Sequence, residues 1–257
     1  MNTLIERPYK SILHFYFKIR NTKPIWELLN RKSRILFATN KPELTDVQKR
    51  LVTDIRRDGI AVTTLDELFP GQNMLGTLNT YAQSLNPEVA EQGKKRFLKK
   101  YWDRYPVFTL NNPFVKLVLE KNILDVVNTY MDMYTKLKYY DLALTIPVSE
   151  GTEAVQSQRW HRDPEEKKIC KVFIYMNDVD SETGPFTYVQ QSNHDGIFGS
   201  LFPQKTPEGV YPPVGAVEKT IPAENIKTMT GKAGTLIFCD TSGIHKGGYA
   251  TKNERLM

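Results

Sequence analysis

The feature that most constrains the fold is a change of residue pattern near residue 136. Beyond it, short runs of β-branched and aromatic residues alternate with turn-forming residues, which is typical of a β-sandwich or jelly roll. These runs cover residues 137–147, 169–176, 186–190 and 235–240. We therefore predict a fold that is mainly β, with a helical N-terminal portion and a jelly-roll core.

The part of the chain before this change has the periodicity of helices. A capping-box pattern from Thr45 to Gln48 predicts a helix start, and Gly59 is well placed to end that helix before a strand at 60–63. A second helical region is predicted at 77–104. A third is predicted at 113–131, because Pro113 is a favourable first-turn residue and an apolar stripe follows it.

The simplest organisation is one domain preceded by a short extension. We predict a helical extension at 1–43 and a domain at 44–257, with helices at 44–135, the core at 136–257 and a possible lid at 196–231. The lid is suggested by five prolines in one long irregular segment, which is uncommon inside a β domain unless it binds something. Residues 9–20 mix aromatic and basic side chains, as a membrane-surface helix does, but we expect them to pack on the domain.

Charge and cysteine content limit the classes of partner and compartment. The net charge is +6, and the positive excess lies in the first 140 residues. Nucleic acid or anionic lipid is a conceivable partner, but Lys and Arg alternate with apolar residues at helical spacing, so we interpret them as solvated helix faces. Cys170 and Cys239 lie in apolar runs, and neither a signal peptide nor a long apolar span is seen. We therefore expect no disulfide and a cytoplasmic location.

A Trp-His-x-Asp sequence at residues 160–163 is the first candidate for chemistry. Residues i and i+2 of an extended chain share a face, so His161 and Asp163 are able to offer a nitrogen and an oxygen to one ion. Taken alone, the pair also fits a surface turn. A second histidine, His245, follows an apolar strand and a glycine-containing turn. Two histidines and a carboxylate form the facial triad of non-haem Fe(II), whereas structural zinc wants a fourth protein ligand.

Arg255 follows His245 by ten residues. A guanidinium makes a bidentate, charge-assisted pair with a carboxylate. If the next strand returns Arg255 beneath the metal, its side chain is able to hold the far carboxylate of a dicarboxylic co-substrate whose 2-oxo acid end chelates iron. Without such a metal site, Arg255 is better explained as a surface arginine.

The order of these residues resembles the phytanoyl-CoA dioxygenase family, a branch of the Fe(II)/2-oxoglutarate-dependent oxygenases with a double-stranded β-helix (jelly-roll, cupin-like) core. The matching features, in order, are Trp-His-x-Asp, Tyr175-Met-Asn-Asp178, an acidic turn reaching Gly184, Gln191-Ser-Asn-His194, His245 and Arg255. The resemblance implies that His161, Asp163 and His245 bind Fe(II), that Arg255 anchors 2-oxoglutarate, and that Phe173 lies beside this co-substrate. Phe173 is equally well explained as ordinary core.

The resemblance also implies an activity. A dioxygenase of this kind uses O₂ and 2-oxoglutarate, releases succinate and CO₂, and hydroxylates a small organic or acyl substrate. Halogenating relatives replace the metal-binding carboxylate by a small residue, so Asp163 favours hydroxylation over halogenation. Two alternatives stay open: a non-catalytic jelly-roll binding protein with a lapsed metal site, and a cupin-like metalloenzyme that does not use 2-oxoglutarate.

Overall fold

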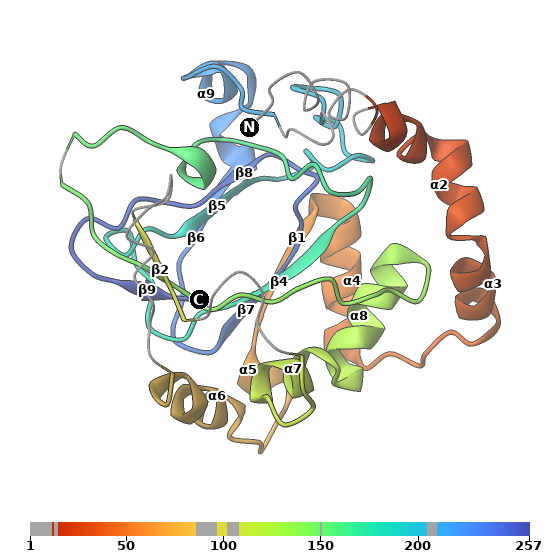
Figure 1. The fold of residues 1–257 in the computed structure, drawn as a ribbon, viewed down its shortest axis with the longest axis horizontal. Coiled ribbons are helices and arrows are strands. Elements are labelled where there is room, and N and C mark those ends of the chain that lie inside the picture. The colour runs from red at the N-terminus through yellow and green to blue at the C-terminus, as the bar shows by residue number, and fades with distance from the viewer. Residues whose placement is uncertain (1–11, 13–14, 86–96, 102–107, 150, 205–209) are drawn as a thin grey trace, which may run out of the picture.

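The described chain folds into antiparallel sheets covered on one side by helices (Figure 1). The computed structural model describes residues 12, 15–85, 97–101, 108–149, 151–204 and 210–257. The strands are β1 (Ile60–Thr64), β2 (Leu98–Lys100), β3 (Ala143–Thr145), β4 (Cys170–Ile174), β5 (Phe186–Val189), β6 (Ile226–Met229), β7 (Thr235–Asp240), β8 (His245–Lys246) and β9 (Arg255–Leu256). The helices are α2 (Lys23–Leu29), α3 (Arg31–Thr39), α4 (Asp46–Asp58), α5 (Leu65–Leu68), α6 (Met74–Gln83), α7 (Pro113–Val118), α8 (Lys121–Met131) and α9 (Ala216–Thr220). The sheet orders are β1-β7-β4, β2-β3-β9 and β6-β5-β8.

The β1-β7-β4 sheet separates two apolar clusters. In β4, Cys170, Val172 and Ile174 pack against the cluster that contains the inner faces of α4 and α8. Phe173 points the other way, into a cluster that also contains Phe186 and Tyr188 from β5. This alternation is the period of two expected of a strand. One face of the sheet therefore lies under helices, and the other faces the β6-β5-β8 sheet.

Helix α4 begins and ends as its sequence predicts. The Thr45 Oγ1 accepts the Gln48 backbone N–H at 3.3 Å, and the Gln48 Oε1 accepts the Thr45 N–H at 2.8 Å, so the capping box is confirmed. Gly59 ends the helix with a φ of 78°. A Cβ on Gly59 would also lie 2.4 Å from the Tyr188 hydroxyl, so this turn has no room for a larger residue.

The remaining helix predictions are right in part. The predicted helix at 77–104 is wrong at 98–100, where β2 pairs with β3, a partner too far along the chain for helical periodicity to reveal. Residues 86–96 and 102–107 lie outside the described residues. The predicted helix at 113–131 is interrupted between α7 and α8. Among the described residues 35% are helical and 19% are in strands. Helix therefore exceeds strand, and the prediction that the chain is mainly β is wrong in this respect.

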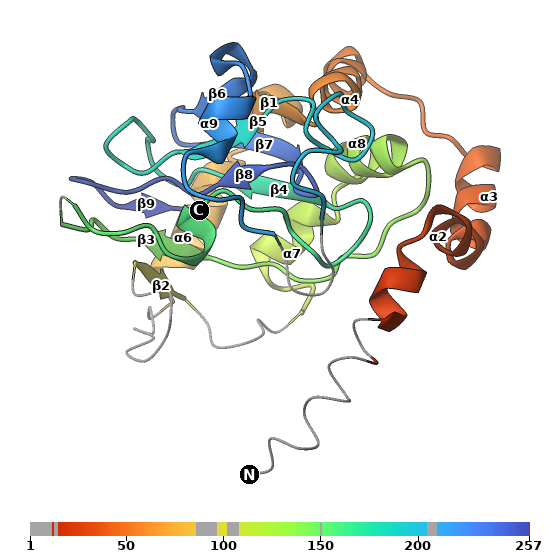
Figure 2. The same cartoon turned by 90° about the horizontal axis from the view of Figure 1, so that it is seen from above.

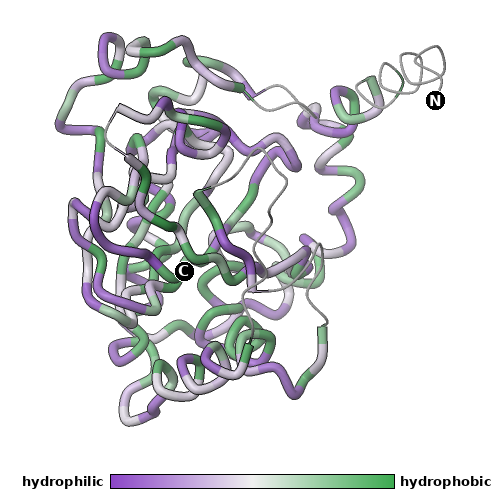
Figure 3. Tube along the Cα trace, turned by 60° about the vertical axis from the view of Figure 1, so that its left-hand side comes forward, coloured by the Kyte–Doolittle hydropathy of each residue, from purple (hydrophilic) through white to green (hydrophobic). Residues whose placement is uncertain are grey.

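The described part of the segment predicted as an N-terminal extension contains helices α2 and α3, which lie at one edge of the molecule (Figures 1 and 2). Residues 1–11 and 13–14 lie outside the described residues. Trp26 and Phe37 are buried and attach α2 and α3 to the domain. Ile12, Phe15, Tyr16 and Ile19 are exposed, so the expectation that this segment packs on the domain is wrong for these side chains. Figure 3 shows hydrophobic and hydrophilic segments alternating along these helices. No helix in the described ranges has the length and apolar character needed to span a membrane.

The segment predicted as a lid, 196–231, contains regular structure. Strand β6 pairs with β5, and α9 buries Val217 in a cluster with Trp160 and Ile244. Residues 205–209 lie outside the described residues. The lid itself stays a prediction, and the residues available to it are those before α9.

Candidate metal centre

The two histidines of the predicted triad are paired through their backbones. His161 donates its N–H to the His245 carbonyl and accepts the His245 N–H in return, each at 2.9 Å. Residues paired in this way across antiparallel segments have their side chains on the same face. The two imidazole centroids are accordingly 4.2 Å apart. The structure thus brings His245 alongside His161, 84 positions apart in the sequence.

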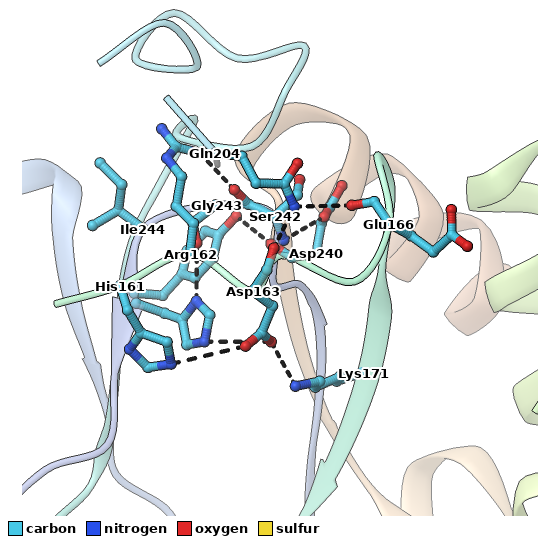
Figure 4. A network of polar contacts seen from close by, with 12 residues as sticks. His161, Arg162, Asp163, Glu166, Lys171, Gln204, Asp240, Ser242, Gly243 and Ile244 are labelled. Atoms are coloured by element: carbon cyan, nitrogen blue, oxygen red, sulfur yellow. Dashed lines mark hydrogen bonds and ion pairs between the residues drawn. The ribbon is translucent and has the colours of Figure 1, made fainter. Parts of the chain in front are cut away.

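Asp163 completes the cluster (Figure 4). Its carboxylate oxygens lie 3.9 Å from the His161 Nε2 and 3.7 Å from the His245 Nε2, and its backbone N–H donates to Thr241 at 2.9 Å. Ligands held about 2.1 Å from an ion lie about 3 Å apart at right angles and about 4.2 Å apart across it, so these separations fit one divalent ion. All three side chains are buried, which excludes the surface-turn interpretation.

The histidine side chains are oriented for metal binding. The His161 Nδ1 donates to the Arg159 carbonyl at 2.8 Å, and the His245 Nδ1 donates to the Gly243 carbonyl at 2.9 Å. A carbonyl only accepts, so the proton of each neutral ring is fixed on Nδ1. With its proton on Nδ1, each neutral ring carries its lone pair on the Nε2 close to Asp163, which is the atom that binds a metal ion.

Burial and neighbouring charges set the protonation of the site. Burial lowers the pKa of His245 to about 3, with help from the nearby His161. Burial alone would raise the pKa of Asp163, but His245 and Lys171 outweigh it and hold this pKa well below its usual range. The metal-free site thus contains a carboxylate and a neutral His245 imidazole at neutral pH, which are the protonation states that bind metal.

This protonation makes the stability of the metal-free protein depend on pH. Between pH values of about 3 and 6.5 the unfolded chain binds a proton at His245 that the folded chain does not bind. The free energy of unfolding should therefore fall as the pH falls through this window, by up to about 1.4 kcal/mol per pH unit. Below about pH 4, the lowered pKa of Asp163 adds to the loss in the same direction.

Urea unfolding of the metal-free protein across this pH range measures the slope. His245→Gln removes the titrating ring and should reduce the slope by up to the contribution of one bound proton. His194→Gln, which changes an exposed histidine, is the matched control. Equal slopes for wild type and His245→Gln would contradict this prediction.

Arg162 lies between the ligands in sequence and points away from them. It is 2% exposed, and its guanidinium donates to the carbonyls of Ser192, Ser242, Leu201 and Phe202, the last two at 2.8 and 2.9 Å. Burial lowers its pKa to about 10, and it stays charged at neutral pH. Arg162 therefore attaches the 192–202 loop to the segment that carries both His161 and Asp163.

Arg255 lies in a buried pocket of polar groups close to this centre. It is 4% exposed, its Nη1 donates to the Gly184 carbonyl, and its Nη2 donates to the Thr145 hydroxyl at 3.2 Å. The buried Nε has no hydrogen-bond partner among the described residues. A Cβ on Gly247, two residues past His245, would lie only 3.9 Å from the Arg255 Nη2. A surface location for this arginine is thus excluded.

The other predicted residues lie at different distances from the triad. The Phe173 ring packs at a tilt against Phe186, with 4.8 Å between ring centroids, and the Phe186 ring centroid is 5.7 Å from that of His245. Phe186 therefore lies between Phe173 and the centre. His194 is exposed and contacts Asp195 at 3.1 Å, away from the cluster.

Two residues at the site were missed from the sequence. Thr145 provides the hydroxyl beside Arg255, and Lys171 contacts the Asp163 carboxylate at 2.5 Å. For Lys171 a signal existed: it is a charged residue within an apolar strand, two positions before Phe173 and therefore on the same face. Thr145 gave no comparable signal, because threonine is ordinary in a strand.

Comparison with solved structures shows that this chain shares its fold with several proteins solved in complex with 2-oxoglutarate (alpha ketoglutarate). The epimerase SnoN, in complex with Fe³⁺, alpha ketoglutarate and nogalamycin RO, is 16% identical with a TM-score of 0.58, covering 82% of this chain and 80% of that chain. EctD from S. alaskensis, with 2-oxoglutarate and 5-hydroxyectoine, is 16% identical (TM-score 0.51; 84% and 77% covered). EvdO2 from Micromonospora carbonacea var. aurantiaca, complexed with 2-oxoglutarate, is 12% identical (TM-score 0.51; 84% and 89% covered).

These identities are low, so they establish a shared fold and nothing finer. No protein-family model matches the sequence, and no curated protein matches it significantly.

Proposed function

We propose that this protein is an Fe(II)- and 2-oxoglutarate-dependent dioxygenase, similar to the phytanoyl-CoA dioxygenase family, that hydroxylates a small organic or acyl substrate. The observation that carries the proposal is the meeting of His161, Asp163 and His245 around one point, with Nε2 atoms and a carboxylate aimed at it. Two nitrogens and one oxygen on one face of an octahedral ion leave three positions open, as this chemistry requires.

The residues present fit both iron and its co-substrate. His161, Asp163 and His245 would hold the metal, and Arg255 would pair with the far carboxylate of 2-oxoglutarate through its unpartnered Nε. The Thr145 hydroxyl, which accepts a hydrogen bond from Arg255, keeps the guanidinium oriented. When bound, iron with 2-oxoglutarate and O₂ supplies the oxidant, and succinate and CO₂ are released.

The remaining parts of the proposal concern the surroundings of the centre. Phe173, on the inner face of β4, forms part of the apolar wall beside the co-substrate, and the segment 196–231 contains the lid over the organic substrate. Retention of the Asp163 carboxylate favours hydroxylation. The free thiols of Cys170 and Cys239 agree with a cytoplasmic location.

Consumption of 2-oxoglutarate tests the proposal. Under anaerobic conditions, Fe(II) and 2-oxoglutarate should give a weak visible charge-transfer band, and O₂ should then yield succinate. Arg255→Met should raise the dissociation constant of 2-oxoglutarate by about 10- to 100-fold, because a charge-assisted pair is lost, while metal affinity stays unchanged. Arg56→Met, which removes an exposed arginine paired with Asp132, is the matched control.

Two results would favour the alternatives. A protein that binds Fe(II) but gives neither the band nor succinate fits a non-catalytic binding protein with a lapsed metal site. A metal-dependent oxidation that proceeds without 2-oxoglutarate fits a cupin-like metalloenzyme.

A further inference from the structure

Lys171 is the charged residue of β4 and lies on the side of that strand that faces the metal centre. Its backbone is paired with Cys239 of β7, while its neighbours Cys170 and Val172 point to the opposite, helix-covered cluster. The Lys171 side chain is 23% exposed. A largely buried ammonium is unfavourable unless a partner compensates its desolvation.

That partner is the predicted metal ligand Asp163. The Lys171 Nζ lies 2.5 Å from the Asp163 Oδ2, and the Tyr139 ring lies 5.7 Å from the same Nζ. Figure 4 shows Lys171 approaching the carboxylate from the side opposite to His161. The Asp163 Oδ2 therefore has two neighbours, the Lys171 ammonium and the His245 Nε2 at 3.7 Å, while Oδ1 lies 3.9 Å from the His161 Nε2.

We infer that Lys171 is a positioning residue that restricts Asp163 to binding the metal through a single oxygen. The inference rests on the proposed function. A carboxylate binds a metal ion through one oxygen or through both. A facial triad leaves three of six positions open, two for a chelating 2-oxo acid and one for O₂. A second oxygen from Asp163 would take one of these positions, and the hydrogen bond from Lys171 opposes this.

The contact also limits how Asp163 is able to move. Without Lys171, the Asp163 carboxylate would face the two imidazoles with both oxygens available. No other side chain among the described residues is shown to donate a hydrogen bond to it. With Lys171, one oxygen is fixed to a strand whose position is set by five paired residues of β7. When a residue that fixes a metal ligand in this way is lost, metal or co-substrate affinity typically falls about 10- to 100-fold.

Co(II) is the probe for the test, because its absorption spectrum reports coordination without any turnover. Lys171→Met keeps most of the length of the side chain and removes its charge. We expect this variant to show an altered Co(II) spectrum before any co-substrate is added, and to bind 2-oxoglutarate about 10-fold more weakly. Lys171→Arg should restore both. Lys168→Met is the matched control, since Lys168 contacts Asp195 at 3.0 Å and not Asp163.

The outcomes separate this inference from the proposed function. A wild-type Co(II) spectrum in Lys171→Met overturns the inference, and an unchanged spectrum with weakened 2-oxoglutarate binding indicates that Lys171 contacts the co-substrate instead. If wild-type protein binds Co(II) but not 2-oxoglutarate, the proposed function fails, although the spectral change in Lys171→Met would still be expected. If Lys171→Met is unstable, Lys171→Ala gives the same readouts.

Discussion

Arg162→Ala is expected to lower the free energy of unfolding by about 3–5 kcal/mol, among the largest effects of any single substitution in this chain. The guanidinium is buried and donates hydrogen bonds to carbonyls of three separate segments, around residues 192, 201 and 242. Removing it leaves these carbonyls buried without a donor and leaves a cavity the size of a large side chain. Replacement by Lys should recover little, because one ammonium is unable to reproduce the planar array of donors.

Urea unfolding followed by far-UV circular dichroism measures this loss. Arg159→Ala is the matched control, since Arg159 is partly exposed and contacts the ring of Tyr211 rather than buried carbonyls. The control should change the free energy of unfolding by less than about 1 kcal/mol. A loss of similar size in both variants would contradict the role assigned to Arg162.

His161→Ala is expected to abolish 2-oxoglutarate turnover and to weaken binding of Fe(II) by at least about 100-fold. The variant removes one of three ligands, a larger change than the loss of a partner to a ligand, which alone costs about 10- to 100-fold. Metal titration and succinate release measure the two effects. The backbone pairing with His245 does not involve the imidazole, so the fold should persist.

His194→Ala is the control for this variant, because it removes an exposed histidine that the structure places outside the cluster. It should leave metal affinity and turnover unchanged. If His161→Ala kept full metal affinity, the assignment of the triad would be wrong.

What could be predicted from the sequence depended on how local the cause was. The start and end of α4 follow from contacts within four residues, so the capping box and Gly59 were readable. The shared face of His161 and Asp163 also follows from local geometry. The meeting of that pair with His245 is a long-range event: the residue types suggested a triad and the resemblance to a known family implied it, but no local pattern required it.

The misses have the same origin. Strand β2 exists because β3 pairs with it, and nothing in residues 98–100 alone distinguishes a strand from a helix. The exposure of Phe15 and Tyr16 could not be read from residue type, since aromatic side chains are usually buried. A lysine in a strand is usually exposed, whereas the register of β4 against β7 places Lys171 on the inner face. That register depends on partners far along the chain.

The reciprocal amide bonds between His161 and His245 have an evolutionary consequence. Main-chain groups are common to nearly all residues, so side chains around both positions are able to diverge widely while the spacing of the two rings is kept. Insertions near these two positions are expected to be tolerated less well than substitutions. One added residue in the turn at 241–244 would shift the pairing by one position and rotate the second imidazole to the other face. Descendants of this chain should therefore tolerate replacement near the centre far better than a change of loop length.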